Sequence, residues 1–540
     1  MSPVEAPGWV GYKPLMLDAF ADLFEPRALA EESRRASAAL WSIALGASDV
    51  APDSDPRFAD PAWTQNPMYR GWAQSYLVWK EMLERLAAAP RDGDWPRAER
   101  ARYAATLLAD MTAPTNLLAG NPDALKHAFD TGGASLRRGA ANAAHDLVRN
   151  GGMPAQVDRR PFTVGENLAA TPGAVVYRDD VFELLQYAPA TARVRTRPVL
   201  MIPPQVNKHY FLDLAPGRSL VEYIVGRGLQ YFSIVWHNPT PEDGGRGIDD
   251  YVAAQLRAID VVREVTGSDE LGLLGVCSGG LTSALMLGHL AAAGEAEAVS
   301  SATFAISMID SRHPNPIGML ATEDVRRRIA RDGEAAVVYD RRRIGRAFAW
   351  LRARDLVFNY VVNDWLKGQD PPAFDVLAWN DDGSDLPARF YAEMFDVYVH
   401  NRAADPGGVT ILDTPVDLGR VTCDSFVVSG QRDHITPWQC GYETSRLLGG
   451  RSEVVVTSTG HIQTMVNPPG KPRARYFAGP EPGPGPEQWM GAATEHEGSW
   501  WPRYAKWLLA RSGDERRAPA ELGSARHRPR DPAPGRYVVE

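Results

Sequence analysis

Cysteine is scarce in this chain of 540 residues, which has only Cys277, Cys423 and Cys440. So few thiols in so long a chain argue against a disulfide framework and suit a reducing compartment, so we expect a cytoplasmic protein. Residues 1–15 lack the basic stretch and apolar run of a secretory signal. No apolar stretch approaches the roughly 18 residues of a membrane span. The sequence therefore predicts neither export nor a transmembrane segment.

An excess of positive charge is missing as well. The chain has 58 Lys and Arg against 67 Asp and Glu, a net charge of −9. Proteins that bind a polyanion carry a basic surface, so we predict no nucleic-acid binding. A few local Arg or Lys side chains could still bind the phosphates of a small ligand, and the sequence does not identify them.

The known cofactor and metal motifs are also absent. The sequence has no G-x-G-x-x-G or Walker pattern, no H-E-x-x-H, no paired C-x-x-C and no cluster of histidines. These patterns bind nucleotide phosphates or metal ions through defined spacings. We therefore predict that the protein uses no cofactor and no metal.

The character of the sequence changes along the chain. Ala- and Leu-rich stretches with proline breaks, such as Ala30 to Leu45 and Met68 to Ala88, are typical of helices. After Arg197, short apolar runs alternate with amphipathic stretches, as in parallel strands joined by crossover helices. The sequence therefore predicts a mainly helical N-terminal domain over residues 1–170 and an α/β domain over residues 171–511.

Six apolar runs are candidate strands of a doubly wound sheet. They lie at residues 197–202, 229–236, 270–276, 299–309, 424–430 and 452–458. An arginine-rich and aromatic segment of helical character interrupts this alternation of strands and helices at about residues 314–421. We expect this insertion to form a lid over the carboxyl edge of the sheet, where ligands bind in such folds. Residues 512–540 are polar and rich in proline, which predicts an exposed tail.

The sharpest local signal surrounds Cys277, where the run at 270–276 leads into an apolar helix. Gly275-Val276-Cys277-Ser278-Gly279 has the form of a nucleophile elbow of the α/β-hydrolase fold, with cysteine in the place of serine. The small residues on either side let the chain turn tightly, and the helix N-terminus favours a thiolate. The motif alone also fits a buried cysteine at a close contact between a helix and a strand.

The partners of such a nucleophile follow it in the expected order. In this fold the acid comes after a later strand and the histidine after the last strand. Asp433 follows the run at 424–430, and His461 follows the run at 452–458. Singly, each is more often a turn or structural residue, but together with Cys277 they predict a catalytic triad. His434 is a competitor for the base, which we rank second, as a contact to the triad or the substrate.

An oxyanion hole in this fold combines two backbone amides. The residue after the nucleophile, Ser278, supplies the first. The loop after the strand at 197–202 supplies the second, which we expect near Val206. A plain turn is the alternative for this proline-containing loop.

With these motifs in place, the sequence resembles the polyhydroxyalkanoate synthases over about residues 55–510. GVCSGG resembles their modified lipase box, SGQRDHITPW their acid loop and TGHIQTMVNPPGKPRARYF their histidine loop. PPQVNKHYFLDLAPGRSLVEY, LVFNYVVNDWL and GSWWPRYAKWL are similar too. One departure is His237 in the W-x-N-P motif, where the family pattern has Lys or Arg, and it leaves the charge contact at this position open.

The resemblance is nearest to the single-subunit types and implies the following reaction. Cys277 is acylated by an (R)-3-hydroxyacyl-CoA, His461 acts as the base, and Asp433 supports it. The family Asp is also proposed to help activate the incoming 3-hydroxyl, and whether Asp433 or His434 does so here stays open. Polyester grows and CoA is released. The resemblance also implies a homodimer at the surface of cytoplasmic polymer granules. Preference for short or medium acyl chains depends on pocket volume and stays open.

Two other functions compete with this interpretation. A cysteine thioesterase or esterase of the same fold would release free hydroxy acid. A granule-binding protein without activity would keep the fold and release no CoA, but the intact Cys277, Asp433 and His461 argue against it. The products distinguish all three functions.

Overall fold

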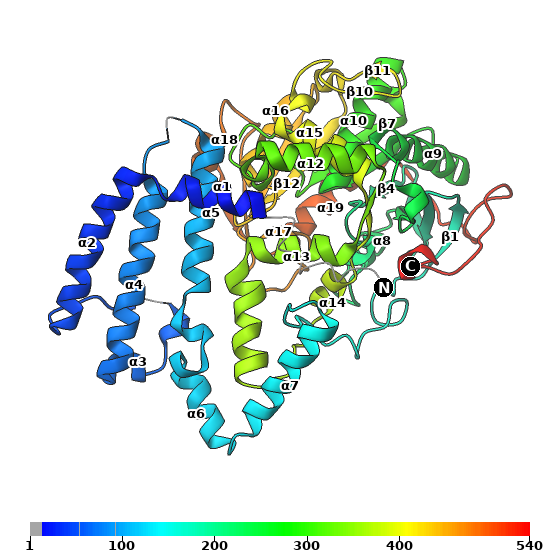
Figure 1. Cartoon of the computed structure of the whole chain (residues 1–540). Coiled ribbons are helices and arrows are strands. Elements are labelled where there is room, and N and C mark those ends of the chain that lie inside the picture. Colours follow the sequence, from blue (N-terminus) through cyan, green and yellow to red (C-terminus); the bar gives the residue numbers. More distant parts are fainter. Residues whose placement is uncertain (1–12, 53–54, 92) are drawn as a thin grey trace. The chain divides into compact units, whose positions relative to one another are not determined.

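The computed structural model describes residues 13–52, 55–91 and 93–540 (Figure 1). Most of residues 1–15, where no secretory signal is expected, lies outside the described part. The chain forms two compact units. Unit 1 contains Met1–Arg159, Met319–Arg326 and Arg342–Leu377, and unit 2 contains Arg160–Gly318, Arg327–Arg341 and Ala378–Glu540. The insertion expected at about residues 314–421 is thus divided between the two units.

Unit 1 is helical, and several of its helices begin where the sequence places a capping side chain before a proline. Asn66 accepts a hydrogen bond from the Met68 amide at 2.9 Å, and Pro67 opens the helix. Asn121 and Pro122 repeat this pattern. Such pairs satisfy a free amide and preset the backbone for the first turn. The helices are α1 (Lys13–Leu23), α2 (Pro26–Ala44), α3 (Ala62–Gln65), α4 (Pro67–Ala88), α5 (Trp95–Met111), α6 (Pro122–Asp130) and α7 (Ala134–Arg149).

The core of unit 1 is formed by small and branched apolar side chains where these helices meet. Figure 1 shows α2, α4 and α5 side by side, and α4 contacts both neighbours. Leu23, Leu83, Leu86 and Ala104 are fully buried there. Within the described residues, no helix is both long enough and apolar enough to cross a membrane.

Part of the insertion packs within unit 1. The segment Val361–Leu366 lies against α7, and a side chain at Gly139 would come within 2.0 Å of the Trp365 carbonyl. The Trp365 indole N–H donates to Asp146 at 2.9 Å. The insertion contains α11 (Pro316–Leu320), α12 (Glu323–Glu334), α13 (Arg341–Leu351), α14 (Asp375–Asp381) and α15 (Ala388–Val399), with β8 (Val338–Tyr339), β9 (Leu386–Pro387), β10 (Thr410–Ile411) and β11 (Thr414–Pro415).

Unit 2 is built on a ten-stranded sheet of order β1-β2-β5-β4-β6-β7-β12-β13-β14-β15. Its six central strands are parallel and lie within the six predicted runs, which confirms the α/β-hydrolase type of sheet. They are β4 (Val199–Ile202), β5 (Tyr231–Trp236), β6 (Leu271–Val276), β7 (Val299–Ala305), β12 (Asp424–Gly430) and β13 (Ser452–Thr457). The antiparallel flanking strands, which the sequence did not reveal, are β1 (Gly173–Arg178), β2 (Phe182–Tyr187), β14 (Arg475–Ala478) and β15 (Thr494–Glu497).

Helices cover both faces of this sheet. On β12, Phe426 stacks on Trp500 and packs on Tyr504 of α19 (Trp501–Leu509). Ser429 points to the other face, because side chains alternate along a strand, and it meets Gly441 of α16 (Trp438–Leu447). The other helices of the unit are α8 (Leu220–Val225), α9 (Ile248–Thr266), α10 (Ser278–Ala293), α17 (His461–Met465) and α18 (Pro486–Ala492). Parallel strands buried on both faces explain their continuous apolar runs.

Strand register brings four loops to one edge of the sheet. Val276, the last residue of β6, lies beside Ala305, the last residue of β7. Ala305 lies beside Val428 of β12, and Gly430 lies beside Thr457 of β13. The residues that follow these strands therefore emerge together at the carboxyl edge.

The expectation of an exposed tail at residues 512–540 needs correction. β16 (Glu515–Arg517) pairs with β3 (Arg193–Arg195), and Val538 is fully buried. Further along, the buried Glu183 of β2 accepts hydrogen bonds from the amides of Arg536 and Tyr537 at 2.9 and 3.1 Å. The segment packs through polar contacts rather than through an apolar stripe, so its composition resembled that of a free tail.

Candidate active site

Cys277 lies at a strained turn between β6 and α10. Its backbone has φ 52° and ψ −122°, a conformation that residues other than glycine rarely adopt. The Cys277 amide donates to the Ala305 carbonyl at 3.0 Å, which holds the turn against β7. Helix α10 begins at the next residue, so the thiol stands at a helix N-terminus and is only half-buried. This is the geometry of a nucleophile elbow.

The predicted need for small residues on both sides of Cys277 is confirmed. A Cβ atom at Gly275 would lie 2.8 Å from the Gly280 Cα. A Cβ atom at Gly279 would lie 2.5 Å from the Ile202 carbonyl oxygen and 2.6 Å from that of Pro203. Because these neighbours are backbone atoms, they cannot move aside at low cost.

Asp433 and His461 form a buried pair. Nδ1 of His461 lies 2.6 Å from Oδ2 of Asp433. Burial would raise the pKa of Asp433, but the charge and hydrogen bond of His461, with two backbone N–H groups, outweigh burial and hold the pKa below its ordinary value. The Asp433 carboxylate therefore remains charged and fixes the orientation of the imidazole.

Cys277 is the second partner of this imidazole. Burial works to lower the pKa of His461, but Asp433 and a hydrogen bond with Cys277 outweigh it and raise the pKa to about 10. Because Nδ1 faces Asp433, Nε2 is the nitrogen left for the thiol. The structure thus brings Cys277, His461 and Asp433 into one chain of contacts. Such a chain can move a proton from sulfur to nitrogen and stabilise the charge that results.

The expected oxyanion loop is tied to the elbow by a residue that sequence reasoning missed. The Ser278 hydroxyl donates to the side-chain Oε1 of Gln205 at 2.8 Å, and the backbone N–H of Gln205 donates to that hydroxyl at 3.2 Å. Ser278 and the neighbouring Val206 are thereby held on adjoining segments. Gln205 stands within the motif PPQVNKHYFLDLAPGRSLVEY, but the motif gave it no role, because that role depends on a contact across 73 residues.

Part of the insertion fastens onto the same loop. The Ser384 amide donates to the Val206 carbonyl at 3.3 Å, and the Tyr210 hydroxyl donates to Asp382 at 2.7 Å. The Trp379 indole donates to the Lys208 carbonyl at 2.8 Å. These bonds hold residues 379–384 against the loop that begins at the end of β4.

Two further side chains near the triad have distinct surroundings. His434, the competitor for the base, follows Asp433 in the chain, but the imidazole bonded to that carboxylate is His461. Tyr398 of α15 is buried, which raises its pKa well above the ordinary value, and a charge on Cys277 raises it further. Tyr398 therefore lies close to the nucleophile and stays neutral.

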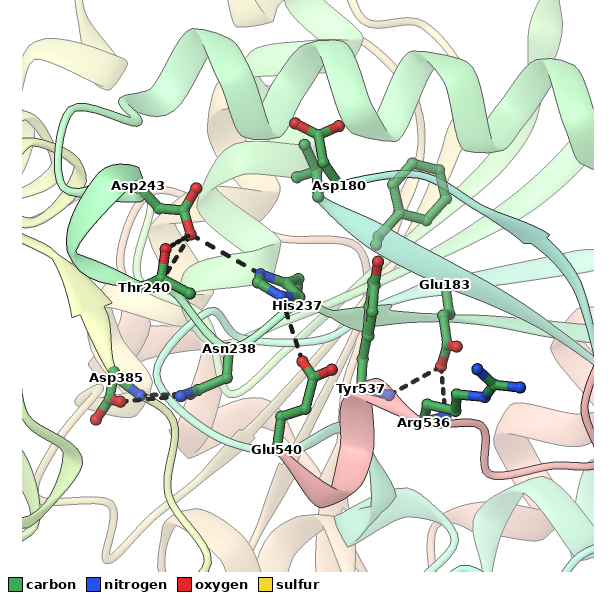
Figure 2. A network of polar contacts seen from close by, with 12 residues as sticks. Asp180, Glu183, His237, Asn238, Thr240, Asp243, Asp385, Arg536, Tyr537 and Glu540 are labelled. Carbon is green, nitrogen blue, oxygen red and sulfur yellow. Dashed lines mark hydrogen bonds and ion pairs between the residues drawn. The ribbon is translucent and has the colours of Figure 1, made fainter.

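The position of His237, whose charge contact the sequence left open, lies beside two carboxylates. Nε2 of His237 lies 3.4 Å from Oε2 of Glu540, and Nδ1 lies 3.9 Å from Oδ2 of Asp243 (Figure 2). The next residue, Asn238, exchanges two hydrogen bonds of 2.9 Å with Asp385. The W-x-N-P motif thus joins the end of β5 to the insertion and to the last residues of the chain.

A metal ion held by protein side chains needs several ligands gathered at one point. The described residues contain no group of three or more His, Cys, Asp and Glu side chains placed to hold a metal ion. The polar groups at the sheet edge are instead bonded to one another.

Comparison with known proteins gives a consistent set of similarities. Residues 54–224 match the family model described as the N-terminus of poly-beta-hydroxybutyrate polymerase (PhaC), and residues 190–468 match the α/β hydrolase fold. Poly(3-hydroxyalkanoate) polymerase 2 of Ectopseudomonas oleovorans is 42% identical, over 93% of this chain and 89% of that protein. The poly(3-hydroxyalkanoate) polymerase subunit PhaC of Cupriavidus necator is 39% identical, over 93% and 86%. A solved esterase from Exiguobacterium antarcticum is 13% identical with a TM-score of 0.30, over 53% and 90%.

Proposed function

The chain belongs to the poly(3-hydroxyalkanoate) polymerase family and is an acyltransferase that makes polyhydroxyalkanoate, and we propose that its reaction runs through an acyl-cysteine at Cys277. His461 is the base, and Asp433 supports it. The observation that supports this assignment most strongly is the contact of His461 with both Asp433 and Cys277.

The first half-reaction transfers the acyl group to the enzyme. His461, whose pKa is raised to about 10, holds the proton of the Cys277 thiol at neutral pH, and the thiolate sulfur attacks the thioester carbonyl of an (R)-3-hydroxyacyl-CoA. The bond between that carbonyl and the CoA sulfur breaks, and CoA leaves as a thiol with the proton from His461. One thioester replaces another, so the acyl group stays activated.

The second half-reaction forms the ester. A 3-hydroxyl group attacks the acyl-cysteine carbonyl and gives its proton to His461, with the Asp433 carboxylate balancing the imidazolium charge. The carbon–sulfur bond breaks, and Cys277 regains its proton. The proposed reaction needs no cofactor, because cleavage of the CoA thioester supplies the free energy that drives ester formation.

Both half-reactions pass through an oxyanion. We assign its stabilisation to the backbone amides of Ser278 and Val206, which would donate to the developing charge. The bond between Ser278 and Gln205 supports this assignment, because it keeps the two segments in register.

Chain growth requires that a hydroxyl group rather than water reaches the acyl-cysteine. The fastening of residues 379–384 to the loop at Val206 and Lys208 supports a covering role for this part of the insertion. We assign no catalytic role to the aromatic side chains of the insertion, most of which are buried or half-buried.

We further propose that the protein works as a homodimer at the surface of cytoplasmic polymer granules. Most of the large apolar side chains that are exposed among the described residues lie on unit 1, between Leu17 and Val148. Trp41 is 69% exposed and Phe129 is 87% exposed. Apolar groups gathered on one unit support contact with an apolar phase. The dimer rests on family resemblance.

The products test the reaction directly. The purified protein and its Cys277→Ala variant are incubated with C4 and C8 (R)-3-hydroxyacyl-CoA, while thiol release and sedimentable polymer are followed together. We expect the wild-type protein to release CoA in step with polymer, and the variant to do neither. Free hydroxy acid in place of polymer would identify a thioesterase instead. Equal release by the variant would exclude Cys277 as the nucleophile.

A further inference from the structure

The Thr436 hydroxyl lies at a branch point beside the triad. Oγ1 is 2.9 Å from Oδ2 of Asp433, 3.0 Å from the Ile306 carbonyl oxygen and 3.2 Å from Nδ1 of His461. Thr436 is buried, so water does not compete for these contacts. A hydroxyl has a single proton to donate. It therefore lies between the Asp433 carboxylate and the backbone after β7, and it donates to one of these two acceptors at a time.

The donors to Asp433 separate cleanly into backbone and side chain. Oδ1 of Asp433 accepts the amides of Ile435 and Thr436, each at 2.9 Å. Oδ2 receives His461 and the Thr436 hydroxyl. Any residue other than proline at position 436 would keep the amide to Oδ1. Only the side chain of Thr436 shares Oδ2 with the imidazole.

The other partner of this hydroxyl has an unusual backbone. Ile306 has φ 43°, which is rare for a β-branched residue, and its side chain is buried. Its amide donates to the Val428 carbonyl at 2.7 Å, so the turn is fixed to β12. The turn directs the Ile306 carbonyl toward Thr436. Strained residues of this kind persist where the surroundings hold them and are frequent at active sites.

We propose that Thr436 is a positioning residue of the triad, which shares Oδ2 of Asp433 with His461 and so limits the negative charge that the carboxylate offers to the imidazole. The inference rests on the proposed roles of Cys277, Asp433 and His461. A hydroxyl donated to a carboxylate oxygen stabilises the carboxylate and weakens its attraction for a neighbouring cation. Thr436 thereby makes His461 a better proton donor to the leaving CoA sulfur.

The ionisable groups around the imidazole allow a clear test. Asp433, after β12, and Cys277, after β6, act on the imidazole directly. His434 follows Asp433 in the chain, and Tyr398 on α15 lies close to Cys277 and to Cys440 on α16. Burial raises the pKa of Tyr398 well above its ordinary value and that of Cys440 to about 12, so neither titrates in the range of an assay. The pKa of Asp433 is lowered, so it stays ionised. Any other group that titrates in this range contributes equally to the two variants at position 436, so the comparison between them isolates the effect of the hydroxyl.

The test compares Thr436→Val, which keeps the branched shape and loses the hydroxyl, with Thr436→Ser, which keeps the hydroxyl. Initial rates of thiol release from C4 (R)-3-hydroxyacyl-CoA are measured against pH, and kcat/KM is fitted. We expect Thr436→Val to move the limb of the profile that reports the loss of the His461 proton to higher pH by about half a unit or more, because the imidazolium becomes more stable. Thr436→Ser should leave the limb in place.

A structural role alone would give a different result. If Thr436 only supports the Ile306 carbonyl, Thr436→Val lowers the thermal unfolding temperature and leaves the limb that reports His461 unmoved, which overturns the proposal. Equal shifts in both variants would overturn it as well.

A second readout keeps the test independent of turnover. The rate at which iodoacetamide alkylates Cys277 is measured against pH, and the inflection that reports the loss of the His461 proton should move to higher pH in Thr436→Val. Thr436→Ala, which also lacks Oγ1, takes the place of Thr436→Val if the latter does not fold. If Cys277→Ala retains thiol release, the proposed function fails; a wild-type profile for Thr436→Val, with Cys277 still essential, overturns only this inference.

Discussion

Two neighbouring strands, β6 and β7, are each followed by a residue with positive φ, yet the two turns have different roles. Cys277 after β6 has φ 52°, and its thiol is half-exposed. Ile306 after β7 has φ 43°, and its side chain is buried. The first turn presents a side chain to the substrate. The second presents a backbone carbonyl to Thr436. In the proposed mechanism, a residue with positive φ thus carries the reacting side chain after one strand and a positioning carbonyl after the other.

The largest effect should come from removing the thiol at the first turn. Cys277→Ala should lower the rate of CoA release by about a thousandfold or more, because the nucleophile is lost while the turn remains. Cys423→Ala is the matched control, since this residue lies before β12 at the opposite end of the strand from Asp433, and it should keep the wild-type rate. Loss of activity in the control alone would reverse the assignment of the two cysteines.

The next largest effect should come from removing the charge of Asp433, the carboxylate that contacts His461 and Thr436. Asp433→Asn should lower kcat by about 10²- to 10⁴-fold, because the imidazolium loses its counter-charge. Initial rates of thiol release at saturating substrate give this value. A loss of less than about threefold would mean that Asp433 has no part in proton transfer.

The same pair makes stability depend on pH. The pKa of His461 is raised to about 10, so its contribution is complete below the unfolded pKa of about 6.5 and is lost as pH rises toward 10. The pKa of Asp433 is lowered, so its contribution is lost as pH falls below the ordinary value. The difference in unfolding free energy between wild type and Asp433→Asn should therefore be largest at about pH 5 to 6 and shrink by pH 9. Urea unfolding at several pH values measures it, and a difference that grows toward pH 9 would contradict the pairing.

A smaller effect is expected from crowding the first turn. Gly279→Ala would place a Cβ atom 2.5 Å from the Ile202 carbonyl oxygen, so the elbow must shift. We expect stability to fall by about 1–3 kcal/mol, together with a loss of kcat. Gly217→Ala is a useful control for a glycine with open space around it, although its φ of 74° adds some strain. Normal kcat in Gly279→Ala would show that the turn tolerates more than its geometry indicates.

The smallest effect should come from trimming the second turn. Ile306→Val keeps the branched side chain and the carbonyl, so we expect a loss of about 0.5–1.5 kcal/mol in stability and an unchanged pH profile. Thermal unfolding and the profile of thiol release measure both. A shifted profile would mean that the side chain at this turn, and not only its carbonyl, affects the triad.

The two turns also differ in how far the sequence reveals them. Gly275 and Gly279 indicate a tight turn at Cys277, since small residues are required there, and the six central strands follow from their apolar runs. Nothing around Ile306 indicates its conformation, because its neighbours are ordinary and the turn depends on the bond to Val428. The sequence gives the identity of Thr436 but does not reveal that its hydroxyl lies beside Asp433 and His461. β15 was missed because its residues, Thr494–Glu497, are polar and mostly exposed.

The last residues of the chain show the same limit. Their polar, proline-rich composition predicts exposure, yet Glu183 binds the amides of Arg536 and Tyr537 from 353 and 354 residues away. Contacts of this kind follow from the fold and not from local pattern. Order along the chain was more informative for Cys277, Asp433 and His461, because the fold family fixes the sequence of strand ends that meet.

The acylated residue is the most direct test of the account. Trypsin places the three cysteines in separate peptides, residues 264–312 with Cys277, 421–432 with Cys423 and 433–446 with Cys440. The enzyme is mixed with C4 (R)-3-hydroxyacyl-CoA, quenched in acid within the first turnovers and digested. The masses of the peptides are then measured by mass spectrometry. We expect the hydroxyacyl mass on peptide 264–312 alone. Polymer formation with the acyl group on another peptide, or on none, would contradict the central claim.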